Sequence, residues 1–213
     1  MSSAFDRRYY ETAYRHYARQ NPPRKLHHYR AAVLRHVPPV RPLRLLDIGC
    51  AFGAFLGSLD AGWQRYGVDA SAYAIERARA QLPGVPLEVS SGVLIPFAER
   101  FDAITAWDVF EHIERLDDVA VGVRDHLTDD GVLLFVVPVY DGPLGGVVSH
   151  LDRDTTHVHR VARQFWLDWA ARSFQLVDWW GIFRILLPGG VYVHWPTRRL
   201  RSIAPAIAVV ARR

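Results

Sequence analysis

Short apolar runs recur along this chain, and most are followed by a glycine or a polar turn and then by a stretch with helical spacing. Buried-strand patterns predict strands at residues 43–48, 65–69, 87–89, 101–107, 132–137 and 175–184. Amphipathic spacing predicts helices at residues 5–19, 24–36, 53–61, 72–81, 117–127 and 161–173. Strands that alternate with helices on this scale favour a parallel sheet covered by helices on both faces.

The composition excludes several classes of protein. A chain of 213 residues that is 50% hydrophobic can bury a substantial core as one domain. The single cysteine, Cys50, permits no internal disulfide, and no apolar run approaches the roughly 20 residues that cross a bilayer. Together with a polar N-terminal segment, these features predict a cytoplasmic protein without a transmembrane segment.

The net charge of +4 is carried almost wholly by arginine, since Lys25 is the only lysine. Arginines make residues 198–213 basic, so contact with an anionic substrate or a membrane surface stays open. No zinc-finger pattern and no interleaving of aromatic and basic residues accompanies this charge. Nucleic acid is therefore disfavoured as a partner.

A glycine-bearing turn directly after the first predicted strand is the most informative pattern. Residues 45–53 read LLDIGCAFG, and Asp69 ends the next predicted strand. Glycine lets the backbone approach a ligand at the carboxyl end of a parallel strand, and an acid at the end of the next strand can accept hydrogen bonds from both ribose hydroxyls. This pairing predicts a nucleotide-type cofactor. A nicotinamide-dependent reductase is disfavoured, because the Gly-x-Gly-x-x-Gly turn that seats a pyrophosphate is absent.

Four segments in series resemble motifs of the class I S-adenosylmethionine-dependent methyltransferases. Residues 45–53 resemble the first motif, with Ala51 in place of its middle glycine. Residues 66–71, YGVDAS, resemble the second strand with its ribose-binding acid, and residues 101–113, FDAITAWDVFEHI, resemble the fourth strand with the Glu-His segment after it. Residues 127–138, LTDDGVLLFVVP, resemble the fifth strand and the turn before it.

The resemblance implies an α/β fold, a Rossmann-like doubly wound sheet of seven mostly parallel strands, in which residues 206–212 form the antiparallel seventh strand. It implies one methyltransferase domain over residues 1–213. Within it, we expect a helical cap at 1–40, a cofactor-binding half at 41–140, and the substrate loop and C-terminal strands at 141–213.

S-Adenosylmethionine is the implied cofactor, and S-adenosylhomocysteine the product. Asp47 is expected near the ammonium group and Asp69 at the ribose. Adenine is expected next to Ala70 and the segment 89–93, VSSGV, which lacks the aspartate that many relatives carry there. Cys50 is interpreted as a packing residue of the first motif. The implied cofactor-binding residues are Asp47, Gly49, Cys50, Ala51, Gly53, Asp69, Ala70, Ser71, Gly92, Val93, Trp107, Asp108 and His112.

The acceptor should lie over the carboxyl ends of the strands, which points to the N-terminal cap and to the loop at 140–160. In that loop, residues 154–160, DTTHVHR, resemble the Asp-x-Thr-His segment of a small-molecule subgroup that includes ubiquinone-type O-methyltransferases. The resemblance implies that His157 lies near the transferred methyl group. A neutral imidazole can take the proton of a hydroxyl acceptor, so His157 is the predicted base, with His150 and His112 as reserves.

The loop at 140–160 also carries groups that could bind a metal ion. The loop holds imidazole and carboxylate groups that could coordinate a divalent ion, namely His150, Asp152, Asp154, His157 and His159. They form no recognisable ligand signature, so a polar lid is favoured and no metal is predicted.

The sequence therefore predicts methyl transfer from S-adenosylmethionine to a small-molecule acceptor, with a hydroxyl oxygen favoured. N- or C-methylation stays open, as does a non-catalytic, cofactor-binding partner subunit of the same fold. A homodimer also stays open.

Overall fold

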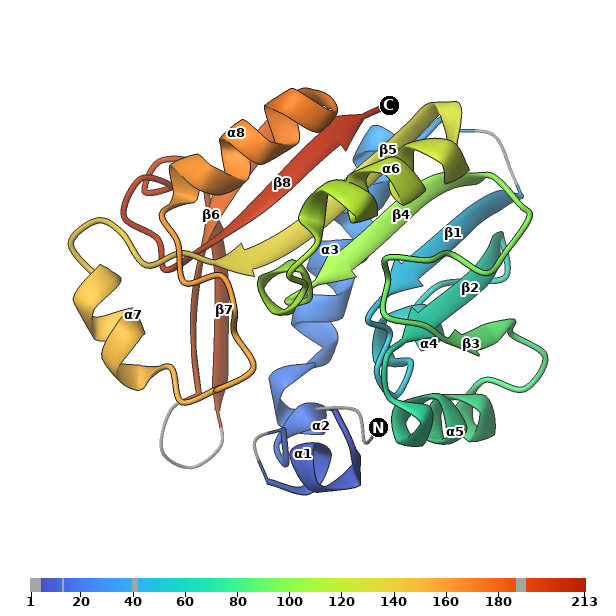
Figure 1. Cartoon of the computed structure of the whole chain (residues 1–213), viewed down its shortest axis with the longest axis horizontal. Coiled ribbons are helices and arrows are strands. Elements are labelled where there is room, and N and C mark those ends of the chain that lie inside the picture. Colours follow the sequence, from blue (N-terminus) through green and yellow to red (C-terminus); the bar gives the residue numbers. More distant parts are fainter. Residues whose placement is uncertain (1–4, 13, 40–41, 187–190) are drawn as a thin grey trace.

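The computed structural model describes residues 5–12, 14–39, 42–186 and 191–213, and a mixed eight-stranded sheet organises this part of the chain (Figure 1). The order of the strands is β3-β2-β1-β4-β5-β8-β6-β7. Their bounds are β1 Leu43–Ile48, β2 Trp63–Asp69, β3 Leu87–Val89, β4 Phe101–Trp107, β5 Leu127–Pro138, β6 Gln175–Leu186, β7 Tyr192–Thr197 and β8 Ala206–Arg212. Strands β1 to β5 pair in parallel, whereas β8 runs antiparallel to both β5 and β6.

The expectation of seven strands is wrong by one. Tyr192–Thr197 forms β7, which pairs antiparallel with β6 at the edge of the sheet. The sequence analysis missed it because Pro196 interrupts the run, and only an edge strand accommodates proline readily. The seventh predicted strand is confirmed as β8, antiparallel and with the expected bounds.

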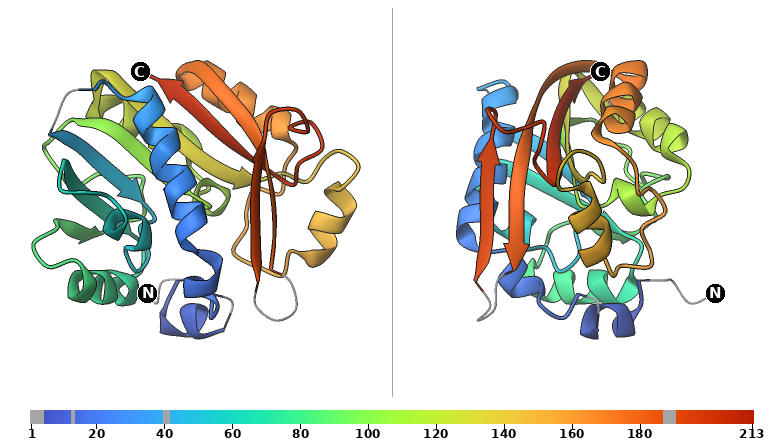
Figure 2. Two further views of the ribbon diagram at one scale, coloured as in Figure 1. Left: turned by 180° about the vertical axis from the view of Figure 1, so that it is seen from behind. Right: turned by 90° about the vertical axis from the view of Figure 1, so that its left-hand side faces the viewer.

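Helices cover both faces of the sheet. In chain order the helices are α1 Arg7–Glu11, α2 Tyr17–Gln20, α3 Pro23–His36, α4 Ala54–Gly57, α5 Ala72–Gln81, the 3-10 helix η1 Phe110–His112, α6 Leu116–His126, α7 Gly145–Leu151 and α8 Arg163–Ser173. Figure 2 shows α3 crossing the face opposite to α6 and α8. None of the helices in the described ranges has both the length and the apolar character to cross a membrane.

The N-terminal segment departs most from the predicted helices. The single helix predicted at 5–19 is two short helices, α1 and α2, and residue 13 of that prediction lies outside the described residues. The side chain of Asp6 accepts a hydrogen bond from the backbone N–H of Tyr9 and so begins α1. Both helices lie below the carboxyl ends of the central strands in Figure 1. The helix predicted at 53–61 is shortened to α4, and α7 was not predicted.

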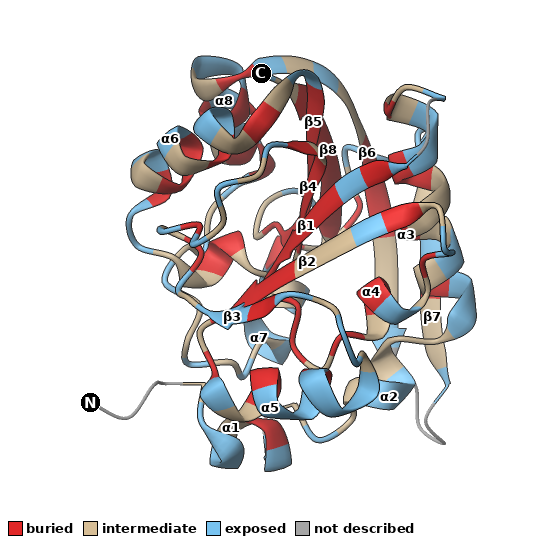
Figure 3. Ribbon diagram, turned by 90° about the vertical axis from the view of Figure 1, so that its right-hand side faces the viewer, coloured by how far each residue is buried: buried red, intermediate tan, exposed pale blue. Residues whose placement is uncertain are grey.

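Two apolar layers hold the sheet between its helices. On one face, Trp166 and Trp169 of α8 pack with α6 residues against the central strands. On the other face, Tyr29 and Val33 of α3 pack with residues of α4 and α5. Figure 3 shows the buried positions concentrated along the central strands, where β1 follows the pattern of a strand buried on both faces. This burial explains why the predicted bounds of β1 and β4 are confirmed. The bounds of β3, an edge strand that is buried only at Leu87, are confirmed as well.

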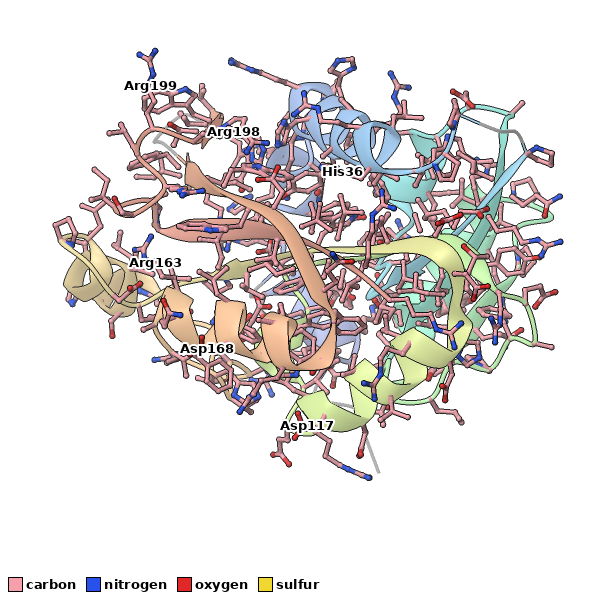
Figure 4. All side chains as sticks on the ribbon, turned by 90° about the horizontal axis from the view of Figure 1, so that it is seen from above. His36, Asp117, Arg163, Asp168, Arg198 and Arg199 are labelled. Atoms are coloured by element: carbon pink, nitrogen blue, oxygen red, sulfur yellow. The ribbon has the colours of Figure 1, made fainter. Side chains whose placement is uncertain are left out.

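A polar cluster around Asp178 of β6 contacts the C-terminal end of α3, away from the carboxyl ends of the parallel strands. Arg198 donates to Asp178 of β6 over 2.7 Å, and His36, the last residue of α3, lies 3.9 Å from the same carboxylate. His36 and Arg198 lie near one another in Figure 4. The position of α3 over the sheet is therefore fixed at its C-terminal end, and its N-terminal end reaches the site described next.

Candidate functional site

A cavity of about 810 Å³ lies at the carboxyl ends of the parallel strands. Its walls come from α1, from α3, from the turns after β1, β2 and β4, from residues 151–157, and from the facing ends of β6 and β7. Segments far apart in the sequence thus contribute to one hollow, at the edge of an open α/β sheet where ligands bind.

The turn after β1 needs glycine at its first position. Gly49 has a φ of +71°, and a Cβ placed there would lie 2.3 Å from a methyl carbon of Val109. Ala51 also has a positive φ, of 47°, which is uncommon for a residue with a side chain. The N–H groups of Gly49 and Cys50 both donate to the carbonyl of Val68. The turn is thereby held against β2, and its backbone faces the cavity.

Asp69 ties the two turns of the cofactor half together. One carboxylate oxygen accepts the N–H of Ala51 over 2.8 Å, and the other accepts the N–H of Ser71 over 2.9 Å. Ser71 in turn begins α5, because its hydroxyl accepts the N–H of Ala74. Burial raises the pKa of Asp69, although both backbone hydrogen bonds oppose the shift. Asp69 also lines the cavity, so it is placed to meet a ligand as well as to hold the loop.

Asp47 lies beneath the turn rather than in the cavity wall. It is 2% exposed, and it accepts a hydrogen bond from the hydroxyl of Thr105 over 2.6 Å. Burial raises the pKa of Asp47 to about 8. A cationic ligand group beside it would reverse this shift, because a positive charge favours the ionised carboxylate.

The structure brings most of the predicted site residues together. The cavity is lined by Gly49, Ala51, Asp69, Ala70, Val93, Trp107, Asp108, His112 and His157. Residues that do not line it are Asp47, Cys50, Gly53, Ser71 and Gly92. Of these, Cys50 is buried in the apolar layer and Gly53 precedes α4 with a φ of +79°. His150, a reserve for the base, is exposed on α7 and does not line the cavity.

His157 is oriented by an acid on its own loop. Its Nδ1 lies 2.8 Å from Asp152 and 3.0 Å from the hydroxyl of Tyr140, and that hydroxyl donates to the same carboxylate over 2.5 Å. Although burial opposes it, these hydrogen bonds lower the pKa of Asp152. An ionised Asp152 accepts the proton on Nδ1, and in that tautomer of the imidazole Nε2 carries the lone pair.

His112 is held in the same way through a hydroxyl. Thr156 donates to Asp154 over 2.5 Å, so its oxygen accepts the proton on Nδ1 of His112 over 2.9 Å. Asp154 also accepts the hydroxyl of Tyr9 from α1 over 2.8 Å. Burial lowers the pKa of His112, which favours the neutral imidazole. These contacts join the N-terminal segment, η1 and the substrate loop.

Glu111 is a site residue that the sequence analysis noted only as the neighbour of His112. It is 1% exposed, and its Oε2 has no hydrogen-bond partner within the described part of the chain. Burial raises the pKa of Glu111 well above its usual value. One ligand atom each of Glu111, His112 and His157 lie within 4.8 Å of one another, so this trio could hold a divalent ion. The trio shares His157 with the loop residues considered as metal ligands from the sequence, whereas Glu111 and His112 come from η1.

The part of the cavity wall that α3, β6 and β7 form is cationic. Lys25 of α3 and Arg184 of β6 both line it, next to Asp108 and Tyr192. Arg184 forms an ion pair with Asp108, whose backbone has a φ of 59°. In this region the sequence analysis named Asp108, as a cofactor-binding residue. Arg184 and Tyr192 were not named, and Tyr192 lies on β7, which was not predicted.

Comparisons with known proteins agree with this geometry. The model of a protein family described as a methyltransferase domain matches residues 14–184. No curated protein matches the sequence.

Among solved structures, an S-adenosylmethionine-dependent methyltransferase of Thermotoga maritima has a TM-score of 0.69 at 14% identity, over 96% of this chain and 98% of that one. The YcgJ protein of Bacillus subtilis has a TM-score of 0.64 at 21% identity, over 88% of this chain and 99% of that one. The N-methyltransferase NodS of Bradyrhizobium japonicum has a TM-score of 0.60 at 16% identity, over 88% of this chain and 96% of that one. At these identities the structures show the fold, which is that of the class I methyltransferases.

Proposed function

Since this chain belongs to the methyltransferase domain family and is therefore an enzyme, we propose that it transfers the methyl group of S-adenosylmethionine to a hydroxyl oxygen of a small molecule. The observation that carries the proposal is one cavity with two chemically distinct ends. Gly49 and Asp69 line one end, and His157, oriented by Asp152, lines the other.

The residues at the first end fit the cofactor. S-Adenosylmethionine supplies a methyl group on a positively charged sulfur when it binds. The backbone of the turn from Gly49 to Gly53 would receive its methionine tail, and Asp69 would accept hydrogen bonds from the ribose. Asp47 would meet the ammonium group, directly or through water, which favours the ionised form of this buried carboxyl.

The residues at the second end fit a hydroxyl acceptor. Nε2 of His157 would take the proton of the acceptor, while Asp152 stabilises the imidazolium that forms. The acceptor oxygen would then form the new bond to the methyl carbon as the carbon–sulfur bond breaks. A general base of this kind contributes about 10²–10⁴-fold to a rate.

A nitrogen acceptor is the alternative that the fold also allows, since NodS is an N-methyltransferase. A neutral amine attacks through its own lone pair and needs no base for the displacement. The Asp152–His157 pair therefore favours oxygen. A divalent ion held by Glu111, His112 and His157 would be a different way to acidify the same hydroxyl, and the unpartnered oxygen of Glu111 is the observation that favours it.

Calorimetric titration with S-adenosylhomocysteine, run beside NAD, tests the cofactor first. We expect micromolar binding of S-adenosylhomocysteine, none of NAD, and a loss of binding in Asp69→Ala. Asp168→Ala is the matched control, because Asp168 is an exposed acid on α8. Failure of S-adenosylhomocysteine to bind the wild-type protein would contradict the proposal.

Turnover is tested next, with a set of small hydroxyl compounds and labelled S-adenosylmethionine. We expect His157→Ala to lose transfer while it keeps the affinity for S-adenosylhomocysteine. Cofactor binding without transfer to any acceptor would instead favour a non-catalytic partner subunit.

A further inference from the structure

Lys25 is a buried cation that has no hydrogen-bond or ion-pair partner among the described residues. It lies in the first turns of α3, it is 4% exposed, and it lines the cavity. Within the described ranges its ammonium group forms no hydrogen bond and no ion pair, and it lies 5.5 Å from the ring centroids of Tyr29 and Tyr192. Two aromatic rings stabilise a cation only in part, because a buried charge needs an opposite charge or several hydrogen bonds.

The charges around Lys25 do not cancel. Arg184 and Asp108 form an ion pair with each other, so together they carry no net charge. His28 and His194 on the neighbouring elements are uncharged at neutral pH, because burial lowers the pKa of His28 to about 4 and that of His194 to about 3. One positive charge therefore remains at this end of the cavity. A singly charged anion would balance it, whereas a doubly charged phosphate would leave a buried negative charge.

This end of the cavity lies on the acceptor side. Arg184 and Tyr192 come from β6 and β7, beyond β5 and β8 in the sheet, whereas Asp69 and Ala70 follow β2 on the opposite side of β1. Since Lys25 lies with these residues of β6 and β7, 5.5 Å from the ring centroid of Tyr192, its cation is placed to meet the acceptor rather than the cofactor.

We propose that Lys25 binds a carboxylate of the methyl acceptor, so that the substrate is a hydroxy acid rather than a neutral alcohol or phenol. The inference rests on the proposed hydroxyl acceptor for its second functional group. Tyr192 and the Asp108–Arg184 pair flank the carboxylate, and the hydroxyl of the same molecule faces His157. The carboxylate then restores the charge balance of the cavity and fixes the orientation of the acceptor.

The single lysine permits a direct test by NMR. Protein labelled with [ε-¹³C]lysine, made without lysine in any tag, has one labelled side chain, that of Lys25. The probes are 2-, 3- and 4-hydroxybenzoate and the three matched hydroxybenzyl alcohols, added to protein saturated with S-adenosylhomocysteine. We expect at least one acid to bind and to raise the pKa of the labelled ammonium, and we expect the alcohols to leave it unchanged.

Two variants support the assignment by calorimetry. Lys25→Met should weaken binding of the preferred acid by roughly 10- to 100-fold, the range for losing a charged hydrogen bond, and should leave S-adenosylhomocysteine affinity unchanged. Arg24→Met removes an exposed cation from the same turn of α3 and should change neither.

Three outcomes would overturn the inference. Equal binding of the acids and the alcohols would show that the charge does not select the acceptor. A shift of the Lys25 signal with S-adenosylhomocysteine alone, and a loss of its affinity in Lys25→Met, would assign the cation to the methionine carboxylate instead. No response to any acid at millimolar concentration would also contradict the inference. Failure of S-adenosylhomocysteine to bind would overturn the proposed function separately, because the acids can be titrated without it.

Discussion

Replacing Asp47 by asparagine is expected to remove the contribution of this buried carboxyl to the pH dependence of the free energy of unfolding of the unliganded protein. Asp47 is 2% exposed, and burial raises its pKa to about 8 from the model-peptide value of 3.8. Between these two values the native state keeps a proton that the unfolded state has lost. The free energy of unfolding of the wild-type protein therefore falls as the pH rises through this window, and Asp47→Asn removes that contribution.

The size of the effect follows from the shift. One proton contributes about 1.4 kcal/mol per pH unit, so the burial of Asp47 costs about 4 kcal/mol at pH 7. Asparagine keeps an acceptor for Thr105 but adds an amide N–H₂ without an obvious acceptor, which costs about 1–3 kcal/mol. The net gain of the variant at pH 7 is therefore about 2 kcal/mol, and near pH 4 the variant should be the less stable protein.

Urea denaturation at pH 5, 6 and 7 measures the difference, with Asp168→Asn on the exposed face of α8 as the control. The difference between Asp47→Asn and wild type should grow by about 1.4 kcal/mol per pH unit, and the control should show no such slope. A difference that stays constant with pH would refute the reasoning, because it would mean that Asp47 is already ionised in the native state.

The same carboxyl should couple proton release to cofactor binding. If the ammonium of S-adenosylhomocysteine ionises Asp47, binding at pH 7 releases close to one proton. Calorimetry in buffers of different ionisation enthalpy measures this number. Asp47→Asn should bind about 10- to 100-fold more weakly and without the release, since it loses a charged partner.

Three further predictions test the site and its scaffold. His157→Ala should lower the turnover number by about 10²–10⁴-fold with unchanged S-adenosylhomocysteine affinity. Equal turnover of the variant and the wild type would exclude His157 as the general base. Gly49→Ala should lower the free energy of unfolding by more than the roughly 1–2 kcal/mol expected of Gly84→Ala, because both have positive φ but only Gly49 lacks room for a Cβ; equal losses measured in urea would contradict the steric argument. Dialysis against EDTA should leave turnover within about twofold of its starting value if His157 is the base. A loss that Mg²⁺, Mn²⁺ or Zn²⁺ restores, and that Glu111→Gln reproduces, would assign a metal to Glu111, His112 and His157 instead.

Local patterns predicted the bounds of the strands β1, β3 and β4 and of the helix α5, and the family resemblance predicted those of β8. A strand buried on both faces is apolar throughout, and Ser71 marks the start of α5 by capping it. The edge strand β7 and the short helix α7 lack such signals, since their side chains are largely exposed or half-buried.

The cofactor half of the site could also be predicted, because its parts are local in sequence. The turn at Gly49 follows β1 and Asp69 ends β2, and these consecutive strands pair in parallel. A glycine that the turn requires for steric reasons, and an acid at the end of a buried strand, can both be recognised from a single sequence. The acceptor half could be predicted only at His157, through a resemblance.

The sequence by itself determined the α/β class, the cofactor turn and most of the strands, because these depend on neighbouring residues and on regular burial. Only the tertiary structure decided which charges meet. Tyr9 reaches Asp154 across 145 residues of chain, and Lys25 of α3 faces Arg184 of β6 in one cavity. Such partners are set by how the N-terminal helices and the β6–β7 hairpin pack over the sheet. Their energies arise from burial, which no local pattern of residues records.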